Sequence, residues 1–407
     1  MNTEFDVVIV GGGLAGASLA AALQGSSLRV AVIETASLGS DFQPSHNDRT
    51  VALAYGSRRI LESIGAWSGV ERLGATPIEH IHISHRGWFG ATRLTARDLD
   101  VPALGYVIEN RALGAALWKR FETAENVVWF CPATVEDIAI DDATALVAVK
   151  QGGETRTLRT RLVIGADGTQ SAVRRLLGIP AERTDYAQTA VVATVAIGKA
   201  HENTAYERFT DTGPLAVLPM RDNRCATVWS ARAADAEVMM QWSDAEFLAR
   251  LQDRFGDRLG RFSQPGNRAR YPLAMTRVPQ QLRSRMVLIG NAAHTVHPVA
   301  GQGFNLGLRD VAALAETLVA GARDGADVGE LALLQRYAEW RRRDTQVTEL
   351  FTDALIRVFS NRSAALGLTR GLGLVAVDLL LPVRRRLLKM TSGLAGRLPR
   401  LARGLSL

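Results

Sequence analysis

The feature that most constrains this chain of 407 residues is a glycine-rich turn that follows its first apolar segment. The run FDVVIV at 5–10 has the unbroken apolar character of a strand that is buried on both faces. It leads directly into GGGLAG at 11–16, and the small residues that follow suit a helix. A second apolar run at 29–33 ends in Glu34. Strand, glycine turn, helix, second strand and acid together predict a βαβ unit that binds a dinucleotide.

Each member of this unit has a separate physical role. Gly11 allows the tight turn, Gly13 lets the backbone approach a pyrophosphate, and Gly16 lets the helix pack on the strand. The free N–H groups at the helix start suit phosphates, and Glu34 suits a pair of ribose hydroxyls. The motif alone does not distinguish NAD from FAD. A second GxGxxG match, at 371–376, follows no strand and is interpreted as part of a tail helix or turn.

The positive charge of the chain is concentrated at its C-terminal end. The formal net charge is +7, and residues 364–407 hold eight basic residues and one acid, so the other 363 residues balance to zero. A basic stripe across the fold is therefore not supported, and we expect no nucleic-acid partner. Leucines and arginines at helical spacing in 379–389 suit an interfacial helix on anionic lipid. A solvated helix that packs on the body or on a partner subunit is the alternative.

The sequence predicts neither an export signal nor a membrane-spanning segment. The apolar run near the N-terminus is preceded by Glu4 and Asp6 and lacks a cationic leader. No stretch reaches the roughly 18–20 uninterrupted apolar residues that a spanning helix needs. The two cysteines, Cys131 and Cys225, are far apart and suit a reducing compartment. We therefore expect a cytoplasmic protein, in peripheral contact with the inner face of the membrane if the tail binds lipid.

Three further segments complete a pattern with the glycine turn. DRTVAL lies at 48–53, and RLVIGADGTQSAVR at 161–174 predicts a strand, an acid–glycine turn and a helix. GNAAHTVHPVAGQGFNLGLRD at 290–310 predicts a loop after an apolar strand, with a helix expected at 305–322. The four motifs, in this order, resemble the flavoprotein aromatic hydroxylases, the group A monooxygenases that include para-hydroxybenzoate hydroxylase.

Within that group the chain is most similar to the ubiquinone-biosynthesis hydroxylases. The similarity rests on DRTVALAYGS at 48–57, NRALGAAL at 110–117 and HPVAGQGFNLGLRD at 297–310. The last loop begins GNAAH in this chain, whereas most relatives have GDAAH. Its asparagine, Asn291, is similar to the branch called 2-octaprenyl-6-methoxyphenol hydroxylase.

The resemblance implies FAD as the cofactor and assigns several of its contacts. Arg49 would lie along the pyrophosphate and ribityl region, with a surface salt bridge as the alternative. Arg111 would lie near the flavin, or it is a surface cation at a helix start. Asp167, which precedes Gly168, would lie near FAD and the incoming nucleotide, and it also suits a helix N-cap. Asn291 replaces an aspartate that bonds the ribityl chain, so it keeps an acceptor but removes one negative charge.

The loop at 290–310 is expected to cradle the flavin ring. Pro298, Gly301 and Gly303 would let the backbone pass close to the isoalloxazine. A helix beginning at Asn305 would direct its N–H groups at the ring edge that becomes negative on reduction. Such a helix end stabilises an anion by roughly 0.3–1 kcal/mol.

Two histidines in this loop are candidates for different roles. His294 and His297 lie three residues apart, but no neighbouring Cys, Asp or Glu completes a ligand set, so no metal is expected. His294 is interpreted as structural. His297 and Pro298 are the predicted catalytic residues, with His297 facing the substrate as the candidate base that helps to deprotonate a phenol.

The resemblance implies an α/β fold in which two domains interleave. One is a Rossmann-like FAD-binding domain of the GR2 type, and the other is a mostly antiparallel β-sheet that covers the flavin and binds the substrate. Segments 78–94 and 185–271 alternate as strands do, and the apolar stretch 213–219 is a candidate pocket wall. The FAD domain is expected at 1–75, 100–180 and 284–360, the substrate domain at 76–99 and 181–283, and a basic helical tail at 361–407.

The resemblance further implies a monooxygenase that uses NAD(P)H and O2 to hydroxylate the ring of a polyprenylated phenol in ubiquinone biosynthesis. Its implied substrate is 2-octaprenyl-6-methoxyphenol. Another flavin phenol hydroxylase or an epoxidase on the same fold is one alternative. A non-catalytic FAD-binding subunit of a ubiquinone-biosynthesis complex is another, suggested by Asn291 and the basic tail. A flavin halogenase is disfavoured, because its Trp-x-Trp-x-Ile-Pro segment is absent from the sequence.

Overall fold

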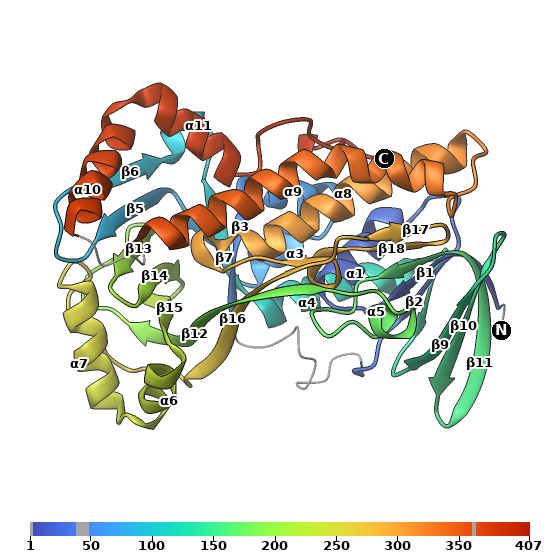
Figure 1. Cartoon of the computed structure of the whole chain (residues 1–407), viewed down its shortest axis with the longest axis horizontal. Coiled ribbons are helices and arrows are strands. Elements are labelled where there is room, and N and C mark those ends of the chain that lie inside the picture. The colour runs from blue at the N-terminus through green and yellow to red at the C-terminus, as the bar shows by residue number, and fades with distance from the viewer. Residues whose placement is uncertain (1–2, 38–48, 360–363) are drawn as a thin grey trace.

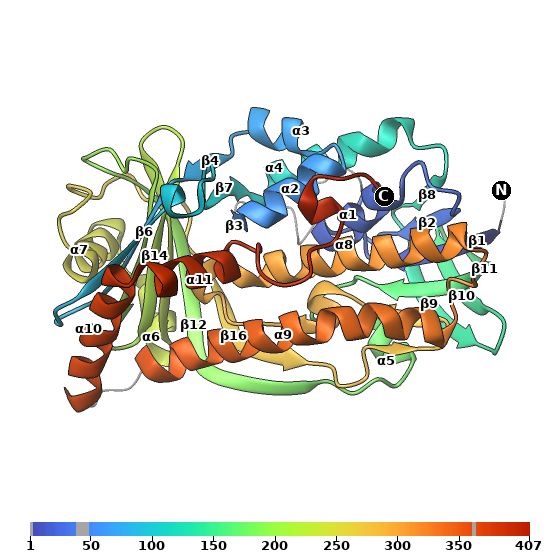
Figure 2. The ribbon, with the colours of Figure 1, turned by 90° about the horizontal axis from the view of Figure 1, so that it is seen from above.

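Two large sheets lie toward opposite ends of the molecule, and two long helices run along its length beside them (Figures 1 and 2). The long helices are α8 (Gln302–Arg323) and α9 (Leu331–Phe359). The structure is a computed structural model, and it describes residues 3–37, 49–359 and 364–407. Asp48, the first residue of one motif, lies outside the described residues.

The first sheet has the parallel centre that the apolar N-terminal runs predict. Strand β1 (Glu4–Val10) lies between β2 (Val30–Ile33) and β11 (Glu154–Gly165), and it pairs in parallel with both. Its residues from Val7 to Ile9 are fully buried, as expected for a strand covered on both faces. The sheet order is β17-β18-β11-β1-β2-β8, and β10 and β9 extend from β11. The other strands are β8 (Val127–Phe130), β9 (Thr134–Ile140), β10 (Ala145–Gln151), β17 (Leu282–Arg283) and β18 (Met286–Leu288).

The glycine turn joins β1 to helix α1 (Leu14–Leu23) at very close range. Gly11 adopts φ +99°, a conformation that favours glycine. A Cβ at Gly16 would lie 1.8 Å from the Gly11 carbonyl oxygen, so only glycine lets the helix pack this closely. The small residues of α1 are almost entirely buried, and the helix packs against α8.

The second sheet is mostly antiparallel, and its order is β19-β16-β12-β15-β14-β13-β5-β6. Its one parallel pair joins β13 to β5. Helices α6 (Ala233–Gln241) and α7 (Asp244–Phe255) cover one face, where Trp229 and Phe247 are core residues. The strands are β5 (His80–His85), β6 (Ala91–Thr95), β12 (Glu182–Ala196), β13 (Thr204–Thr210), β14 (Gly213–Met220), β15 (Arg224–Arg232), β16 (Ala269–Arg277) and β19 (His294–Thr295).

A three-stranded sheet of order β3-β7-β4 connects the two large sheets (Figure 2). It contains β4 (Thr76–Ile78), so the first residues of the segment predicted for the substrate sheet pair with β7 instead. Short helices follow the strands of this region and of the first sheet. The elements are β3 (Thr50–Ala54), β7 (Gly105–Glu109), α2 (Tyr55–Ser63), α3 (Trp67–Arg72), α4 (Asn110–Trp118) and α5 (Ala172–Leu176).

The basic tail is docked on the body of the protein. Its helices are α10 (Ala364–Leu379) and α11 (Leu381–Thr391), and the GxGxxG match at 371–376 lies inside α10, as the tail-helix interpretation predicts. Arg384 pairs with Asp98 at 2.9 Å. The Ser63 hydroxyl donates to the Leu401 carbonyl oxygen at 2.9 Å. Within the described ranges, we find no helix with the length and apolar character needed to cross a membrane.

A buried network of charges joins α8 to α9 and to the loop before α8. The Asp310 carboxylate lies 2.6 Å from His294 Nε2 and accepts a hydrogen bond from Arg341 Nε at 2.8 Å. Asp344 accepts from Arg309 Nε at 2.8 Å and from Arg341 as well. Burial alone would raise the pKa of Asp310, but His294 and Arg341 lower it to about 2. The network therefore gives His294 a structural role and ties the two long helices together.

We expect Asp310→Asn to destabilise the protein by about 3 kcal/mol, because it removes one of the two carboxylates that pair with buried Arg341 and the carboxylate that pairs with His294. Urea unfolding monitored by circular dichroism measures this loss. The matched control is Asp211→Asn, which breaks an ion pair with Arg254 at a carboxylate that is 53% exposed, and it should cost about 0–1 kcal/mol. Equal losses in the two variants would contradict the role assigned to the network.

The same variant has a pH signature. The folded-state pKa of Asp310 is about 2, below the value of ~3.9 for an unperturbed Asp. Its stabilising contribution is therefore complete above pH ~4 and is lost as the pH falls through ~2. Wild-type protein should lose more stability than Asp310→Asn over this window.

Candidate active site

A large cavity lies where the first sheet, the three-stranded sheet and the second sheet meet. Its volume is about 2390 Å³, whereas a site for one drug-sized ligand typically encloses about 300–1000 Å³. The cavity therefore has room for a dinucleotide and a second ligand. Its wall includes the glycine turn, β3, the loop before α8, one face of the second sheet, and parts of α10 and α11.

The glycine turn forms one end of the cavity. Gly11, Gly13 and Glu34 all line it. Gly13 is the N-cap residue of α1, with φ −65° and ψ −172°, and it has no side chain to occupy the first N–H groups of the helix. The Glu34 carboxylate accepts from the Gly12 N–H at 2.6 Å and from the Ala36 N–H at 2.9 Å. It is held in place and still has lone pairs for ligand hydroxyls.

Asp167 lies at the cavity and bonds the first turn of α5, although it is not the N-cap that its sequence context suggests. It lines the cavity beside Gly168, and its Oδ2 accepts from the Val173 N–H at 3.0 Å in the first turn of α5. The N-cap itself is Ser171, whose hydroxyl accepts from the Arg174 N–H at 3.1 Å. Asp167 Oδ1 is buried and has no hydrogen-bond partner among the described residues. Leaving such an atom unpaired costs about 1–3 kcal/mol, so the site is suited to a ligand that donates a hydroxyl here.

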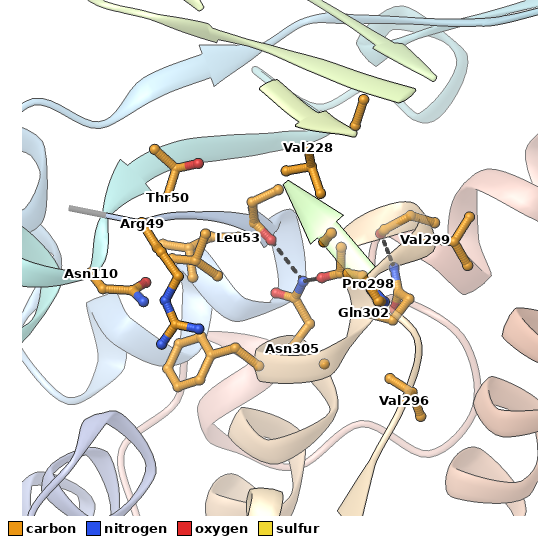
Figure 3. A pocket seen from close by; sticks show the side chains of 18 of the residues that line it. Arg49, Thr50, Leu53, Asn110, Val228, Val296, Pro298, Val299, Gln302 and Asn305 are labelled. Carbon is orange, nitrogen blue, oxygen red and sulfur yellow. Dashed lines mark hydrogen bonds between the residues drawn. The ribbon is translucent and has the colours of Figure 1, made fainter. Parts of the chain in front are cut away.

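The two arginines predicted for the cofactor site both line the cavity, among other arginines, but in different ways. The Arg49 guanidinium lies over the Tyr271 ring of β16, 4.3 Å from its centroid, and so spans from the cofactor end to the second sheet. Arg111 is 3.5 Å from Glu109 and is more than half exposed. Figure 3 shows Arg49 and Asn110 on one side of the pocket. Arg49 is half-buried, whereas Arg111 is exposed.

The loop before α8 lines the cavity with its backbone. Asn291 and Pro298 are exposed in it, and Gly301 adopts φ +61° as the N-cap residue of α8. A Cβ at Gly303 would meet no atom within 4 Å, so the backbone there is open to a ligand. The helix begins at Gln302 and not at residue 305, so the predicted helix start was three residues late.

Asn305 lines the cavity, but its side chain is fully used within the protein. Its Oδ1 accepts from the Ala54 N–H at 2.8 Å and from the Ser57 hydroxyl at 2.7 Å. Its Nδ2 donates to the carbonyl oxygens of Ala52 at 2.8 Å and Gly301 at 2.6 Å (Figure 3). The amide therefore fixes the helix start against β3 and α2, and it positions the cofactor site without contributing a free polar atom.

The prediction that His297 faces the substrate is wrong. Its side chain is 1% exposed and is absent from the cavity wall, although its neighbours Val296 and Pro298 line it. His297 Nδ1 accepts from the Val299 N–H at 3.2 Å, and its ring packs edge-on against Tyr186. Burial lowers the pKa of His297 to about 4. The histidine therefore braces the loop, whereas Pro298 remains at the cavity.

The far end of the cavity is mostly apolar, and sequence reasoning found only part of it. In the predicted stretch 213–219, Ala216 and Leu218 line the cavity, whereas Leu215 and Val217 lie on the opposite face under α6 and α7. The contribution of the tail was missed. Tail residues in the wall include Thr369, Leu374, Val377, Leu387 and Thr391. Their spacing on amphipathic helices marks buried positions, but not what they cover.

Comparison with known proteins identifies the ligand that this geometry suits. The family described as "FAD binding domain" matches residues 4–351. The chain belongs to this FAD-binding family. The flavoprotein is 38% identical to "Ubiquinone hydroxylase UbiL" of Rhodospirillum rubrum, covering 99% of this chain and 93% of that one. It is 32% identical to "3-demethoxyubiquinol 3-hydroxylase" of Escherichia coli, covering 97% of this chain and all of that one.

Solved structures share the fold of the flavoprotein. The p-nitrophenol 4-monooxygenase PnpA of Pseudomonas putida superposes with a TM-score of 0.81 at 22% identity, over 98% of this chain and 100% of that one. PqsL of Pseudomonas aeruginosa superposes with a TM-score of 0.76 at 25% identity, over 90% of this chain and 100% of that one. The flavoprotein is an FAD-dependent monooxygenase, so a non-catalytic subunit is set aside.

The residues of the cavity fit FAD. Gly13 and the open N-terminus of α1 suit the pyrophosphate, Glu34 suits the adenosine ribose, and the unpaired oxygen of Asp167 suits a hydroxyl donor. FAD supplies the redox chemistry when bound, with NAD(P)H as the reductant and O2 as the oxidant. The backbone at Gly301 and Gly303 and the positive end of the α8 dipole would be available to the flavin ring.

We expect Gly13→Val to abolish retention of FAD while the fold survives. The φ and ψ of Gly13 are ones that valine adopts, but a branched side chain at the cavity wall would block the approach of the pyrophosphate. The absorbance spectrum of the purified variant reports bound flavin, and its thermal melt compared with FAD-stripped wild type reports folding. A yellow, FAD-saturated variant would contradict this assignment of the phosphate site.

Proposed function

We propose that this monooxygenase hydroxylates the ring of a polyprenylated phenol in ubiquinone biosynthesis. The observation that carries the proposal is the single cavity, which continues from the dinucleotide end to an apolar end walled by the second sheet and the tail. An apolar channel suits an isoprenoid chain, and its junction with the cofactor end suits the phenol ring. The names of two similar proteins, a ubiquinone hydroxylase and a 3-demethoxyubiquinol 3-hydroxylase, support the same pathway.

The proposed substrate is 2-octaprenyl-6-methoxyphenol. The support for this choice is the GNAAH loop, whose Asn291 lines the cavity in place of an aspartate. A neutral amide keeps a hydrogen-bond acceptor and removes a negative charge near the reacting ring. The 3-demethoxyubiquinol hydroxylase of Escherichia coli, at 32% identity, makes a second ring position the main alternative.

The protein residues have two tasks in this reaction. The backbone at Gly301 and Gly303 positions the flavin, and Pro298 and Val299 lie beside it in the wall. The apolar residues of the second sheet hold the phenol ring and keep water out, which protects the oxygen-transfer step from unproductive side reactions. Neither task requires a metal or a nucleophilic side chain.

The test is turnover on matched phenols. FAD-loaded enzyme with NADPH or NADH should consume reductant and convert 2-octaprenyl-6-methoxyphenol to a product one oxygen heavier by mass spectrometry. A demethoxyubiquinol analogue and a phenol without a prenyl chain are the comparison substrates. Preferred turnover of the demethoxyubiquinol analogue would replace the proposed substrate. Reductant consumption without any hydroxylated quinone precursor would overturn the proposed function.

We also propose that the tail contacts an anionic membrane. Leu372, Leu379 and Leu380 of the α10–α11 region are 55%, 75% and 52% exposed. Exposed Arg385 and Arg386 lie on the next turns of α11. Apolar side chains beside cations suit the boundary between acyl chains and anionic headgroups. A polyprenyl substrate resides in the bilayer, so contact here would place the apolar end of the cavity near its source.

We expect Leu372→Ser, Leu379→Ser and Leu380→Ser together to lower the affinity for anionic liposomes at least about tenfold, because full burial of one leucine contributes about 1.5–3 kcal/mol. Co-sedimentation with phosphatidylglycerol vesicles measures this, and flavin content should not change. The matched control is Val238→Ser, a residue that is 53% exposed on the distant helix α6 (Figure 1). Unchanged binding by the triple variant would exclude the membrane role and leave a partner subunit as the occupant.

Deleting residues 364–407 would be a poorer test. The tail supplies Leu374 and Thr391 to the cavity wall, and the Thr391 carbonyl oxygen accepts a hydrogen bond from Gln302 Nε2 at 3.2 Å. Removal would therefore disturb the active site together with the surface.

A further inference from the structure

One carboxylate lies in the mostly apolar wall that the described strands of the second sheet present to the cavity. It belongs to Glu207, in the middle of β13. The two faces of this strand differ. Tyr206 packs edge-on against Phe255, and Arg208 Nε donates to the Arg254 carbonyl oxygen at 3.0 Å, so these neighbours face α7. Because side chains alternate along a strand, Glu207 faces the cavity.

The residues beside Glu207 leave space for a ring. Its partner on β14 is Ala216, its partner on β5 is Ile83, and Val228 lies one strand beyond Ala216. All three line the cavity. The small Ala216 side chain leaves room directly beside the carboxylate. Among the described residues, Glu207 has no side-chain hydrogen bond or ion pair, so its oxygens are free for a ligand.

Glu207 also lies between two points where the second sheet touches the cofactor-holding segments. Ala205, two residues before it on the same face, belongs to an apolar cluster with Val107 and Ala52 of the three-stranded sheet. Phe209, two residues after it, belongs to a cluster with Val299 of the loop before α8. A ring held between these two contacts would have the flavin side of the cavity on one face and the Glu207 carboxyl within reach.

The surroundings of Glu207 set its protonation. Burial raises the pKa of Glu207 to about 7. Other charged or titratable groups along this wall include Arg183, Arg224 and Tyr271 of the second sheet and Arg370 of α10. His85 lies on the same face of β5 as Ile83. Burial lowers the pKa of His85, and Arg370 lowers it further. The pKa of the Glu207 carboxyl therefore lies near neutral pH, and a general base is most effective when its pKa is close to the operating pH.

We infer that Glu207 is a catalytic residue that accepts a hydrogen bond from the ring hydroxyl of the phenol and takes its proton as the ring is hydroxylated. This inference rests on the proposed function. The phenol O–H bond breaks, its electron pair stays on the phenol oxygen, and a new O–H bond forms on the Glu207 carboxylate. No electrons are gained or lost in this step. The electron density left on the ring promotes attack by the oxygen donor, and the proton returns to solvent when the product leaves.

The test compares Glu207→Gln and Glu207→Asp with wild type. Glu207→Gln keeps the shape but cannot take a proton, so we expect kcat for hydroxylation to fall about 10²–10⁴-fold, with KM changed only a few-fold. Wild-type kcat should rise with pH through about 7, and this limb should vanish in Glu207→Gln. Glu207→Asp should restore part of kcat. The matched control is Glu202→Gln, an exposed residue just before the same strand, which should behave as wild type.

Two further measurements keep the inference distinct from the proposed function. Infrared difference spectra of the FAD-loaded protein should show a carboxylic-acid band that titrates near pH 7 in wild type and is missing in Glu207→Gln. Binding of a simple methoxyphenol, followed by perturbation of the flavin spectrum, should weaken in Glu207→Ala. If these results hold while wild type turns over no prenylated phenol, only the proposed substrate fails. Unchanged kcat and pH profile in a folded Glu207→Gln would overturn the assignment of Glu207.

Discussion

Four hydrogen bonds from one buried amide, that of Asn305, hold the active site together. They join the start of α8 to the backbone of β3, to Ser57 of α2 and to the Gly301 carbonyl. A buried amide with all its partners satisfied is rigid, because any movement leaves a polar atom unpaired at a cost of about 1–3 kcal/mol. The loop before α8 is therefore fixed from its last residue. Five residues further along α8, Asp310 fixes its other side through His294 and Arg341.

The two faces of the second sheet have different roles. One face is a closed core under α6 and α7, and the other is the wall of the cavity. Side chains alternate between the two faces of a strand. The side chains of Tyr206 and Arg208, which flank Glu207 in sequence, therefore lie on the opposite face of the sheet. Residues of α10 and α11 in the tail form a further part of the cavity wall. The tail helices that line the cavity thus also carry the surface that we propose for lipid contact.

Several site residues could be predicted from sequence, and others could not, for physical reasons. The glycine turn, Glu34 and Asp167 carry local backbone signatures, and they line the cavity as a dinucleotide site requires. Asn305 and His297 sit inside an equally informative motif, yet their side chains turn to the protein. Whether a polar side chain faces a ligand or braces a loop depends on partners more than 50 residues away in the chain. A detectable signal for Glu207 existed, since an acid between Ala205 and Phe209 breaks an apolar strand face, but strand alternation does not say what that face meets.

The sequence by itself determined the βαβ unit, its dinucleotide chemistry and the order of the cofactor-binding segments, because these depend on backbone conformations and periodicities that a few neighbouring residues impose. Only the tertiary structure decided which side chains share the cavity. It brought β13, the loop before α8 and the C-terminal helices to one site, although they are separated by up to about 190 residues along the chain. It also turned His297 away and left Glu207 facing inward. Such contacts are set by how sheets and helices pack, and packing is a property of the whole chain.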